Sequence, residues 1–221
     1  MKIACFIPIK SNSERVPGKN FRILCNRPLY QYIIDHAIEA DCFDTIFVDT
    51  NSEDVKKYCE KVGAKWIERE AELAKNTANG NDLLNYHYEK FPEFDYYFQL
   101  FATAPFLQPA SISNAVRTLT ESTEYDSTFT ALSQHGFYWY ANVPVNYRPA
   151  ILPRSQDMLP VIEETTGLYG ISNASLKKYR CRIGSKPYVC VVNKFEAIDI
   201  NTEDDLKMAE FVGEIYWKYS K

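Results

Sequence analysis

The stretch Ile3-Ala-Cys-Phe-Ile-Pro-Ile9, followed at once by Lys10-Ser-Asn-Ser-Glu-Arg-Val-Pro-Gly-Lys-Asn20, decides the fold. Its first seven residues are nearly all apolar, which is typical of a strand buried on both faces of a parallel sheet. The polar residues after them form a loop at the carboxyl end of that strand. Open α/β sheets bind their ligands at this edge, so the loop is the first candidate site.

Strands and helices alternate along the rest of the chain. Apolar, β-branched and aromatic runs predict further strands over 45–48, 64–67, 96–102, 127–132, 167–171 and 187–192. Helical spacing and capping residues predict helices over 28–40, 53–62, 81–90, 111–119 and 202–219, with Ser52 and Ser111 as N-caps and Gly63 as a stop. This alternation predicts an α/β fold with a doubly wound, mostly parallel, Rossmann-like sheet.

The segment 136–160 interrupts this alternation, because it is rich in proline and shows neither the helical nor the strand period. We interpret it as an excursion from the sheet, a protruding arm that covers roughly 136–165. No internal repeat and no low-complexity linker divides the chain, so residues 1–221 are expected to form a single domain.

Composition excludes several classes of protein. The 221 residues are 46% apolar, enough to bury a core, which argues against a disordered chain. With 25 Lys and Arg against 29 Asp and Glu, no basic surplus exists for binding nucleic acid or an anionic membrane. Six cysteines lack metal-site spacing, and neither a leader peptide nor a run of about 20 apolar residues is visible. We therefore expect a cytoplasmic protein with reduced cysteines.

The loop after the first strand has the chemistry of a phosphate site. Small polar residues and a glycine let backbone N–H groups approach phosphate oxygens closely. Lys10, Arg15 and Lys19 place three cations within ten residues, which suits a polyphosphate. The loop is neither a Walker A motif nor a GxGxxG motif. The alternative interpretation is a solvated basic loop.

The same loop resembles the N-terminal signature of the cytidylyltransferases that activate acidic sugars, the acylneuraminate and Kdo family. The family pattern is roughly IPARxxSxxxPGKN; Ser13, Gly18, Lys19 and Asn20 match it, and Lys10 stands where the family usually has Arg. The resemblance implies that the loop wraps the triphosphate of CTP. It then makes Lys10, Arg15 and Lys19 the catalytic cations. The nucleotide-binding residues in the loop are Ser11, Ser13, Gly18 and Asn20.

Further segments resemble family motifs in the same order along the chain. Residues 66–74 look like the segment that ends RPxELA, and residues 76–80 are similar to the D-T-A-S-x stretch. In the family these segments line the pocket for the cytosine base. The implied base-pocket residues are Arg69, Ala78, Asn79 and Gly80.

Residues 153–169 resemble RxQDxPPxYxENGAIY, a motif on the side of the acceptor sugar. The acceptor-binding residues that this motif implies are Arg154, Gln156 and Glu164. Residues 100–107 stand where the family's sugar-binding strand reads LQPTSPLR, with Phe101 in place of its Gln. Thr103 of this segment, and Gln99, which points to the same face as Phe101, complete the predicted acceptor residues. Arg154 is our candidate for a bidentate pair with the acceptor carboxylate. The resemblance also implies a homodimer in which the excursion 136–160 reaches the partner subunit.

A metal site is expected near the end of the chain, where residues 197–206 resemble DIDTxxDL. Asp199 and Asn201 lie two apart in an extended segment, so their side chains point to one face. Two such oxygen ligands, completed by water and substrate phosphates, are how Mg²⁺ is normally held. The family's carboxylates at this motif hold Mg²⁺. The alternative is that 201–202 caps the terminal helix beside a solvated Asp199, and both interpretations can hold together.

The sequence thus predicts an enzyme, a CTP-dependent nucleotidyltransferase. It would transfer CMP to a 2-keto sugar acid of the nonulosonate (sialic-acid-like) or Kdo type, with release of pyrophosphate, in the biosynthesis of cell-surface polysaccharide. Phe101 replaces a family Gln and Thr165 a family Asn, which keeps open a non-sugar acceptor such as a phosphonate or a phosphorylated small molecule. Asn201 replaces a family Asp, which keeps open a catalytically weak nucleotide-binding homologue.

Overall fold

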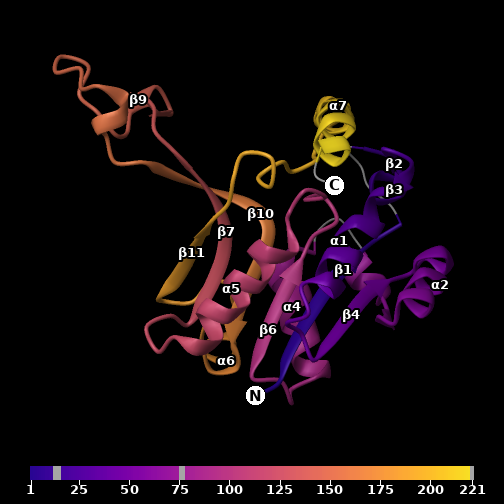
Figure 1. Ribbon diagram of the computed structural model, residues 1–221. Helices are drawn as coiled ribbons and strands as arrows, with labels where there is room; N and C mark the ends of the chain where they lie inside the picture. The colour runs from indigo at the N-terminus through magenta and orange to yellow at the C-terminus, as the bar shows by residue number, and fades with distance from the viewer. Residues whose placement is uncertain (12–15, 75–77, 220–221) are drawn as a thin grey trace.

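A seven-stranded sheet forms the centre of the computed structural model, which describes residues 1–11, 16–74 and 78–219 (Figure 1). The strand order is β11-β7-β10-β6-β1-β4-β5. Its strands are β1 (Ile3–Ile9), β4 (Thr45–Thr50), β5 (Lys65–Glu68), β6 (Tyr96–Leu100), β7 (Ser127–Gln134), β10 (Val161–Ser172) and β11 (Pro187–Val191). Strand β10 is antiparallel to both of its neighbours, and the other pairs are parallel. The predicted α/β fold with a mostly parallel sheet is confirmed.

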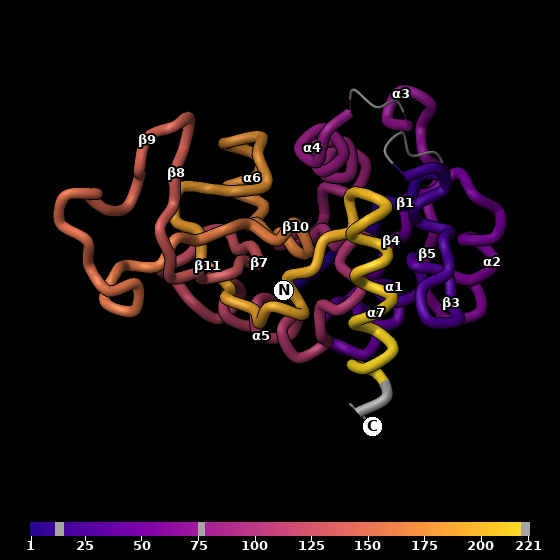
Figure 2. The backbone as a smooth tube through the Cα atoms, turned by 90° about the horizontal axis from the view of Figure 1, so that it is seen from above, coloured from indigo at the N-terminus to yellow at the C-terminus, as the bar shows by residue number. Residues whose placement is uncertain are grey.

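Helices cover both faces of the sheet, as a doubly wound fold requires (Figure 2). Helices α1 and α5 lie on one face, and α4 and α6 on the other. The helices are α1 (Leu29–Glu39), α2 (Glu53–Val62), α3 (Ala71–Ala74), α4 (Gly80–Lys90), α5 (Pro109–Glu121), α6 (Asn173–Tyr179) and α7 (Glu203–Tyr219). The described chain also contains two short hairpins: β2 (Ile23–Leu24) pairs with β3 (Arg27–Pro28), and β8 (Trp139–Tyr140) pairs with β9 (Val143–Pro144). There are 3₁₀ turns at η1 (Lys19–Phe21) and η2 (Ser155–Asp157).

The apolar character of β1 follows from its central position. Successive residues of a strand point to opposite faces, so β1 serves two cores. Cys5 and Ile7 belong to the cluster that contains α1 and α5, whereas Phe6 belongs to the one that contains Leu84 of α4. All three of these β1 side chains are fully buried. A strand with one solvated face would have alternated with polar residues.

The ends of the helices test the predicted caps. Helix α2 stops at Gly63, which has φ 82, because glycine adopts the left-handed conformation without a steric penalty. Helix α5 begins at Pro109 with Gln108 as its N-cap, so Ser111 as its N-cap is wrong by three residues. Proline fits the first turn because it has no N–H to leave unsatisfied and its φ is already helical.

The arm comprises residues 135–160, between the end of β7 and the start of β10 (Figure 1). It projects away from the sheet and carries the β8–β9 hairpin. Trp139 Nε1 donates a hydrogen bond of 2.9 Å to Tyr147 Oη, which links β8 to the chain that follows the hairpin. Residues 161–165, which the sequence assigned to the arm, belong to β10. In the described part of the chain, no helix has the length and apolarity to span a membrane.

Candidate active site

The loop after β1 is anchored at both of its described ends. Ser11 N donates to Asn51 Oδ1 at 3.2 Å, and Asn20 Nδ2 donates to the Lys10 carbonyl at 3.0 Å. Gly18 has φ 62, a left-handed conformation that favours glycine. Two predicted site residues of the loop, Ser13 and Arg15, lie outside the described residues.

Lys19 connects this loop to the predicted metal motif. Its side chain is nearly buried, and its Nζ donates to the Ile200 carbonyl at 2.8 Å. Ile200 N in turn donates to the carbonyl of Thr103, just after β6, at 2.9 Å. The structure therefore brings Lys19, Thr103 and the turn 199–201 together at the carboxyl edge of the sheet.

One carboxylate oxygen of Asp199 is hydrogen-bonded, and the other has no hydrogen-bond partner in the described part of the chain. Its Oδ2 accepts hydrogen bonds from Thr166 Oγ1 at 2.7 Å and from Asn201 Nδ2 at 2.5 Å. Its Oδ1 is buried and has no hydrogen-bond partner among the described residues. A buried carboxylate oxygen without a partner carries a desolvation cost, which a bound cation would offset.

The backbone at Thr166 is strained, with φ 53 in a β-branched residue. The strain lies in the irregular part of β10, where the pairing with β7 shifts register between Glu164 and Tyr169. It aims the Thr166 hydroxyl at Asp199. Strained residues of this kind cluster at functional sites, which supports the assignment of this edge as the site.

Helix α7 is capped by Thr202 and Asp205, so the side chain of Asn201 is available to donate a hydrogen bond to Asp199. Thr202 N donates to Asp205 Oδ2 at 2.7 Å, and Asp205 N donates back to Thr202 Oγ1 at 3.2 Å, a reciprocal capping box. Burial opposes ionisation of Asp205, but the bonds from Asn201 and Thr202, with the nearby charge of Lys19, leave its pKa below the usual value. Asp205 is therefore a carboxylate at neutral pH.

Acidic side chains surround a pocket of about 320 Å³ at this edge. Asp199, Asn201 and Asp205 form one wall, and Glu163 and Glu164 of β10 form another. No group of three or more His, Cys, Asp or Glu side chains is arranged as a complete metal site within the residues described. The donors present fit a hard cation that takes its remaining ligands from a substrate, as Mg²⁺ does.

Arg69, the predicted reader of the base, is one member of a buried network. Its Nε donates to Asp49 Oδ1 at 3.0 Å, and its Nη2 donates to the Asp49 carbonyl at 3.2 Å. On the other side of Asp49, Oδ2 lies 3.0 Å from His87 Nε2, and the imidazole stacks on Phe6 with ring centroids 4.4 Å apart. The guanidinium of Arg69 is thereby fixed at the end of β5.

The charges of this network follow from burial and pairing. Burial raises the pKa of Asp49, but His87 and Arg69 together lower it by more, so the pKa lies below its usual value. Burial lowers the pKa of His87 more strongly than Asp49 raises it, so the imidazole is neutral at pH 7. Asp49 and His87 were not predicted, although a lone acid directly after the run 45–48 was a usable signal.

The segment 78–80 lies beside β6. Asn79 caps α4, its Oδ1 accepting from Asn81 N at 2.8 Å, so its side chain is already engaged. Gln99 Nε2 donates to the Gly80 carbonyl at 3.0 Å, while Gln99 Oε1 is buried with no partner in the described structure. Gln99 thus joins the predicted base segment to the predicted acceptor strand.

The predicted acceptor residues fall into two separate places. Glu164 lies in the acidic pocket, where its Oε2 accepts from Tyr169 Oη at 2.6 Å. Arg154 and Gln156 lie on the arm, which projects from the body (Figure 1). Arg154 makes a double hydrogen bond to Asp157, at 2.7 and 3.0 Å, and its side chain is 72% exposed. Within one chain the structure does not bring these two arm residues to the edge of the sheet.

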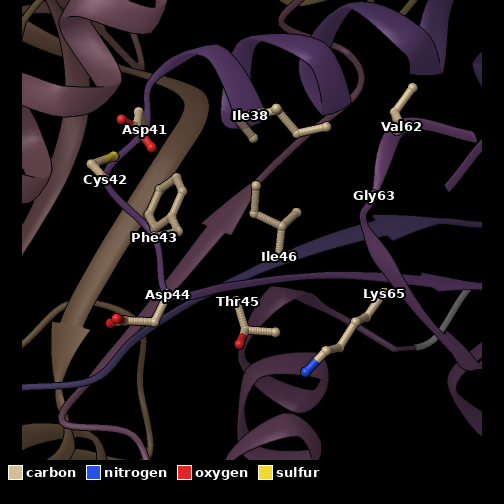
Figure 3. Close-up of a pocket in the computed structure, with 11 residues that line it drawn as sticks. Ile38, Asp41, Cys42, Phe43, Asp44, Thr45, Ile46, Val62, Gly63 and Lys65 are labelled. Atoms are coloured by element: carbon tan, nitrogen blue, oxygen red, sulfur yellow. The ribbon is translucent and has the colours of Figure 1, made fainter. Parts of the chain in front are cut away.

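A different hollow, of about 230 Å³, lies at the opposite edge of the sheet (Figure 3). It is lined by residues that precede β4 and β5 or begin these strands, among them Asp41, Asp44 and Lys65. None of the predicted site residues lines it. The candidate site is therefore the carboxyl edge, where the loop, the 199–201 turn and Arg69 gather.

Comparison with protein families agrees with this geometry. The model of a family described as Cytidylyltransferase matches residues 4–199, from β1 to Asp199. The chain belongs to the cytidylyltransferase family.

Relatives of known function share most of the chain at low identity. An N-acylneuraminate cytidylyltransferase A from Danio rerio is 26% identical over 216 residues, covering 94% of this chain and 50% of the relative. A CMP-N,N'-diacetyllegionaminic acid synthase from Legionella pneumophila is 33% identical over 122 residues, or 52% of each chain. The chain spans about half the length of the curated relatives it matches.

Solved structures confirm the fold. A CMP:2-keto-3-deoxy-manno-octonic acid synthetase complexed with CTP superposes with a TM-score of 0.72, covering 98% of this chain and all of that one, at 16% identity. A 4-diphosphocytidyl-2C-methyl-D-erythritol synthase from Anaerococcus prevotii superposes with a TM-score of 0.60, at 14% identity. At these identities the likeness establishes the nucleotidyltransferase fold.

Replacing Asp49 with Asn tests the buried network. The change leaves the Arg69 charge without its buried partner, so we expect the free energy of unfolding to fall by about 3–5 kcal/mol. Denaturant unfolding at pH 7 measures this loss. Glu53→Gln is the matched control, because the Glu53 side chain is 74% exposed and its partner Lys56, 2.7 Å away, keeps a second carboxylate in Glu68, so the change should alter stability little. Equal effects of the two substitutions would contradict the role given to Asp49.

Proposed function

We propose that this chain is a CTP-dependent cytidylyltransferase that transfers CMP to a 2-keto sugar acid of the nonulosonate or Kdo type and releases pyrophosphate. The observation that carries the proposal is the hydrogen bond from Lys19 Nζ to the Ile200 carbonyl. It unites two motifs, 181 residues apart, that such a reaction needs side by side: a cationic phosphate loop and an acidic turn. The family match and the named relatives support the same activity.

The chemistry asks the protein for positioning and charge neutralisation. The anomeric hydroxyl of the acceptor attacks the α-phosphorus of CTP in line, a new P–O bond forms, and pyrophosphate departs. Lys10 and Lys19 neutralise charge on the triphosphate, and Arg15 is assigned to the same task. Arg69, held by Asp49, and the backbone of 78–80 are assigned to binding of the cytosine base.

We propose that Asp199 and Asn201 hold Mg²⁺ together with the substrate phosphates. The buried Oδ1 of Asp199, which has no partner in the described part of the chain, supports this assignment. Mg²⁺ bound there would neutralise charge on the triphosphate and on the departing pyrophosphate. Thr166 and Asn201 orient the carboxylate for that role through its Oδ2.

We propose that the chain acts as a homodimer in which the arm of one subunit reaches the site of its partner. Arg154 and Gln156 contact the acceptor there, although they lie away from the site of their own chain. The arm exposes an unusual number of large apolar side chains, which a second subunit would cover. They are Phe137, Trp139, Tyr140, Val143, Val145, Ile151, Leu152 and Leu159.

We further propose that the enzyme works in the cytoplasm and supplies activated sugar acids for cell-surface polysaccharide. All six cysteines are free thiols, which fits a reducing compartment. The predicted absence of nucleic-acid and membrane partners rests on the net charge of −4.

A non-sugar acid is the second candidate acceptor, and one observation favours it. Phe101 packs edge-on against Tyr169, with ring centroids 6.2 Å apart, where the family places a polar Gln. An apolar wall at this point discriminates against a hydroxyl-rich acceptor. A panel of sugar acids, phosphonates and phosphorylated small molecules, scored by pyrophosphate release, separates the two; release with none would favour a weak homologue.

Thermal stability in the presence of nucleotides tests the choice of CTP. At about 100 times its Kd, a ligand stabilises by about 2.7 kcal/mol, which raises the melting temperature by about 5–10 °C. We expect this shift with CTP and Mg²⁺, and a smaller one with UTP, ATP or GTP. Lys19→Ala should lose both the shift and turnover, whereas Lys207→Ala on the exposed face of α7 should keep both. A larger shift with another nucleotide would contradict the assignment of Arg69.

Substituting Asn201 with Asp tests the metal site. The additional carboxylate raises the negative charge that faces the cation, so we expect Mg²⁺ to bind roughly threefold to tenfold more tightly. Calorimetric titration of Mg²⁺ in the presence of CTP measures the affinity. Asp204→Asn, a substitution on the exposed start of α7, is the control and should leave the affinity unchanged. Unaltered affinity in Asn201→Asp would argue against a metal at this turn.

Charged substitutions on the arm test the dimer. Leu152 and Leu159 are 70% and 88% exposed, so replacing both with Asp should not disturb the core of one chain. We expect the double variant to be monomeric by light scattering and to lose acceptor turnover while CTP still raises its melting temperature. Met208→Asp, at an exposed position on α7, should remain a dimer. A wild-type chain that is monomeric at working concentration would refute the proposal directly.

A further inference from the structure

Arg182, which no motif singled out, lies at the candidate site. It belongs to the loop between α6 and β11 that runs alongside the first turns of α4. Its backbone N donates to Asn81 Oδ1 at 3.0 Å, which fixes the loop against the helix. Its guanidinium carbon is 3.6 Å from the centroid of the Tyr169 ring, a close cation–π contact on a buried side chain.

The absence of a side chain at Gly80 makes room for this guanidinium. A Cβ built on Gly80 would lie 2.5 Å from Arg182 Nη1, well inside contact distance. The guanidinium therefore rests against the first residue of α4 on one side and Tyr169 of β10 on the other. Two packed neighbours hold the planar group in one orientation before any ligand arrives.

Two predicted acceptor residues, Glu164 and Gln99, are hydrogen-bonded to the neighbours of Arg182. Tyr169 Oη donates to Glu164 at 2.6 Å, and Gln99 donates to the carbonyl of Gly80 at 3.0 Å. Gln99 is fully buried, yet its Oε1 has no partner in the part of the chain described. Burial, the bond to Glu164 and the charge of Asp199 raise the pKa of Tyr169, and the charge of Arg182 opposes them, which places all four groups in one electrostatic neighbourhood.

Arg182 places a positive charge, not paired with a described carboxylate, close to the acidic pocket. The acidic pocket repels a carboxylate, so an acidic acceptor needs a cation beside it. Five other arginines of the described chain already have carboxylate partners, among them Arg69 with Asp49, Arg154 with Asp157 and Arg180 with Glu89. Arg182 has no carboxylate oxygen within 4.0 Å among the described residues.

We propose that Arg182 binds the carboxylate of the acceptor and so determines that the substrate is an acid. Stacking on Tyr169 occupies the face of the guanidinium and leaves its N–H edge for a bidentate pair. The cation for the acceptor then comes from the same chain that binds the nucleotide, and Arg154 of the arm adds a contact elsewhere on the acceptor. This inference rests on the proposed function.

Steady-state kinetics of Arg182→Gln, with pyrophosphate release as the readout, test the assignment. The acceptor probes are N-acetylneuraminic acid, N,N'-diacetyllegionaminic acid and 2-keto-3-deoxy-manno-octonic acid, each with CTP and Mg²⁺. We expect the acceptor KM to rise about tenfold to a hundredfold, because a charge-assisted bond is lost, while the KM for CTP stays within about twofold. Arg182→Lys, which keeps the charge and loses the fork, should fall between Arg182→Gln and the wild type.

Arg180→Gln is the matched control, because Arg180 lies in the same loop and its exposed side chain pairs with Glu89. It should leave both KM values unchanged, and the CTP-induced rise in melting temperature shows whether each variant keeps an intact nucleotide site. An unchanged acceptor KM in Arg182→Gln overturns the assignment, and so does a rise confined to the KM for CTP. A wild-type chain that neither uses nor is stabilised by any of the acids overturns the proposed function and this inference together.

Discussion

The hydrogen bond from the buried Lys19 to the carbonyl of Ile200 is the contact on which the site depends. It joins the loop after the first strand to the turn before the last helix, and the same turn is fastened to β6 through Thr103. A lysine that donates to a carbonyl keeps its full charge, so this contact fixes its position without neutralising it. The edge of the sheet thereby presents cations and carboxylates side by side, as transfer of a nucleotide requires.

The antiparallel strand β10 completes the site from the other direction. Since it runs against its neighbours, its first residues and not its last lie at the carboxyl edge. Glu164 and Thr166 reach the acidic pocket and Asp199 for that reason. The arm connects the end of β7 to the start of β10, so it begins and ends at the edge of the sheet that carries the candidate site.

Much of the fold was predictable because the sheet is buried on both faces. The apolar runs 3–9 and 96–102 predicted central strands, and β1 and β6 lie there, although β6 ends at Leu100. Gly63 was predicted to end a helix, and it ends α2. The loop after β1 and the 199–201 turn were marked by motifs, and the structure brings them together. The roles assigned to their residues, to Arg69 and to Gln99 remain predictions. A motif identifies a segment of the chain, however, and does not reveal which residues from other segments contact it in the folded protein.

The residues that the sequence analysis missed, Asp49, His87 and Arg182, lie outside the motifs and contact site residues only in the folded protein. Asp49 and His87 stand alone in a strand and a helix, and only the folded sheet brings them to Arg69. Arg182 sits in a loop with no motif, and its role depends on the space that Gly80 leaves. Thr166, which stands in place of the family Gly, is the departure that the structure explains: its hydroxyl orients Asp199.

The strained backbone of Thr166 has a consequence for how this protein can change. Glycine at this position would adopt the same φ of 53 without steric strain. It would also remove the hydroxyl that holds Asp199. A relaxed backbone and a fixed orientation of Asp199 therefore exclude each other at this single residue, and a change that relieves the strain also loosens the carboxylate.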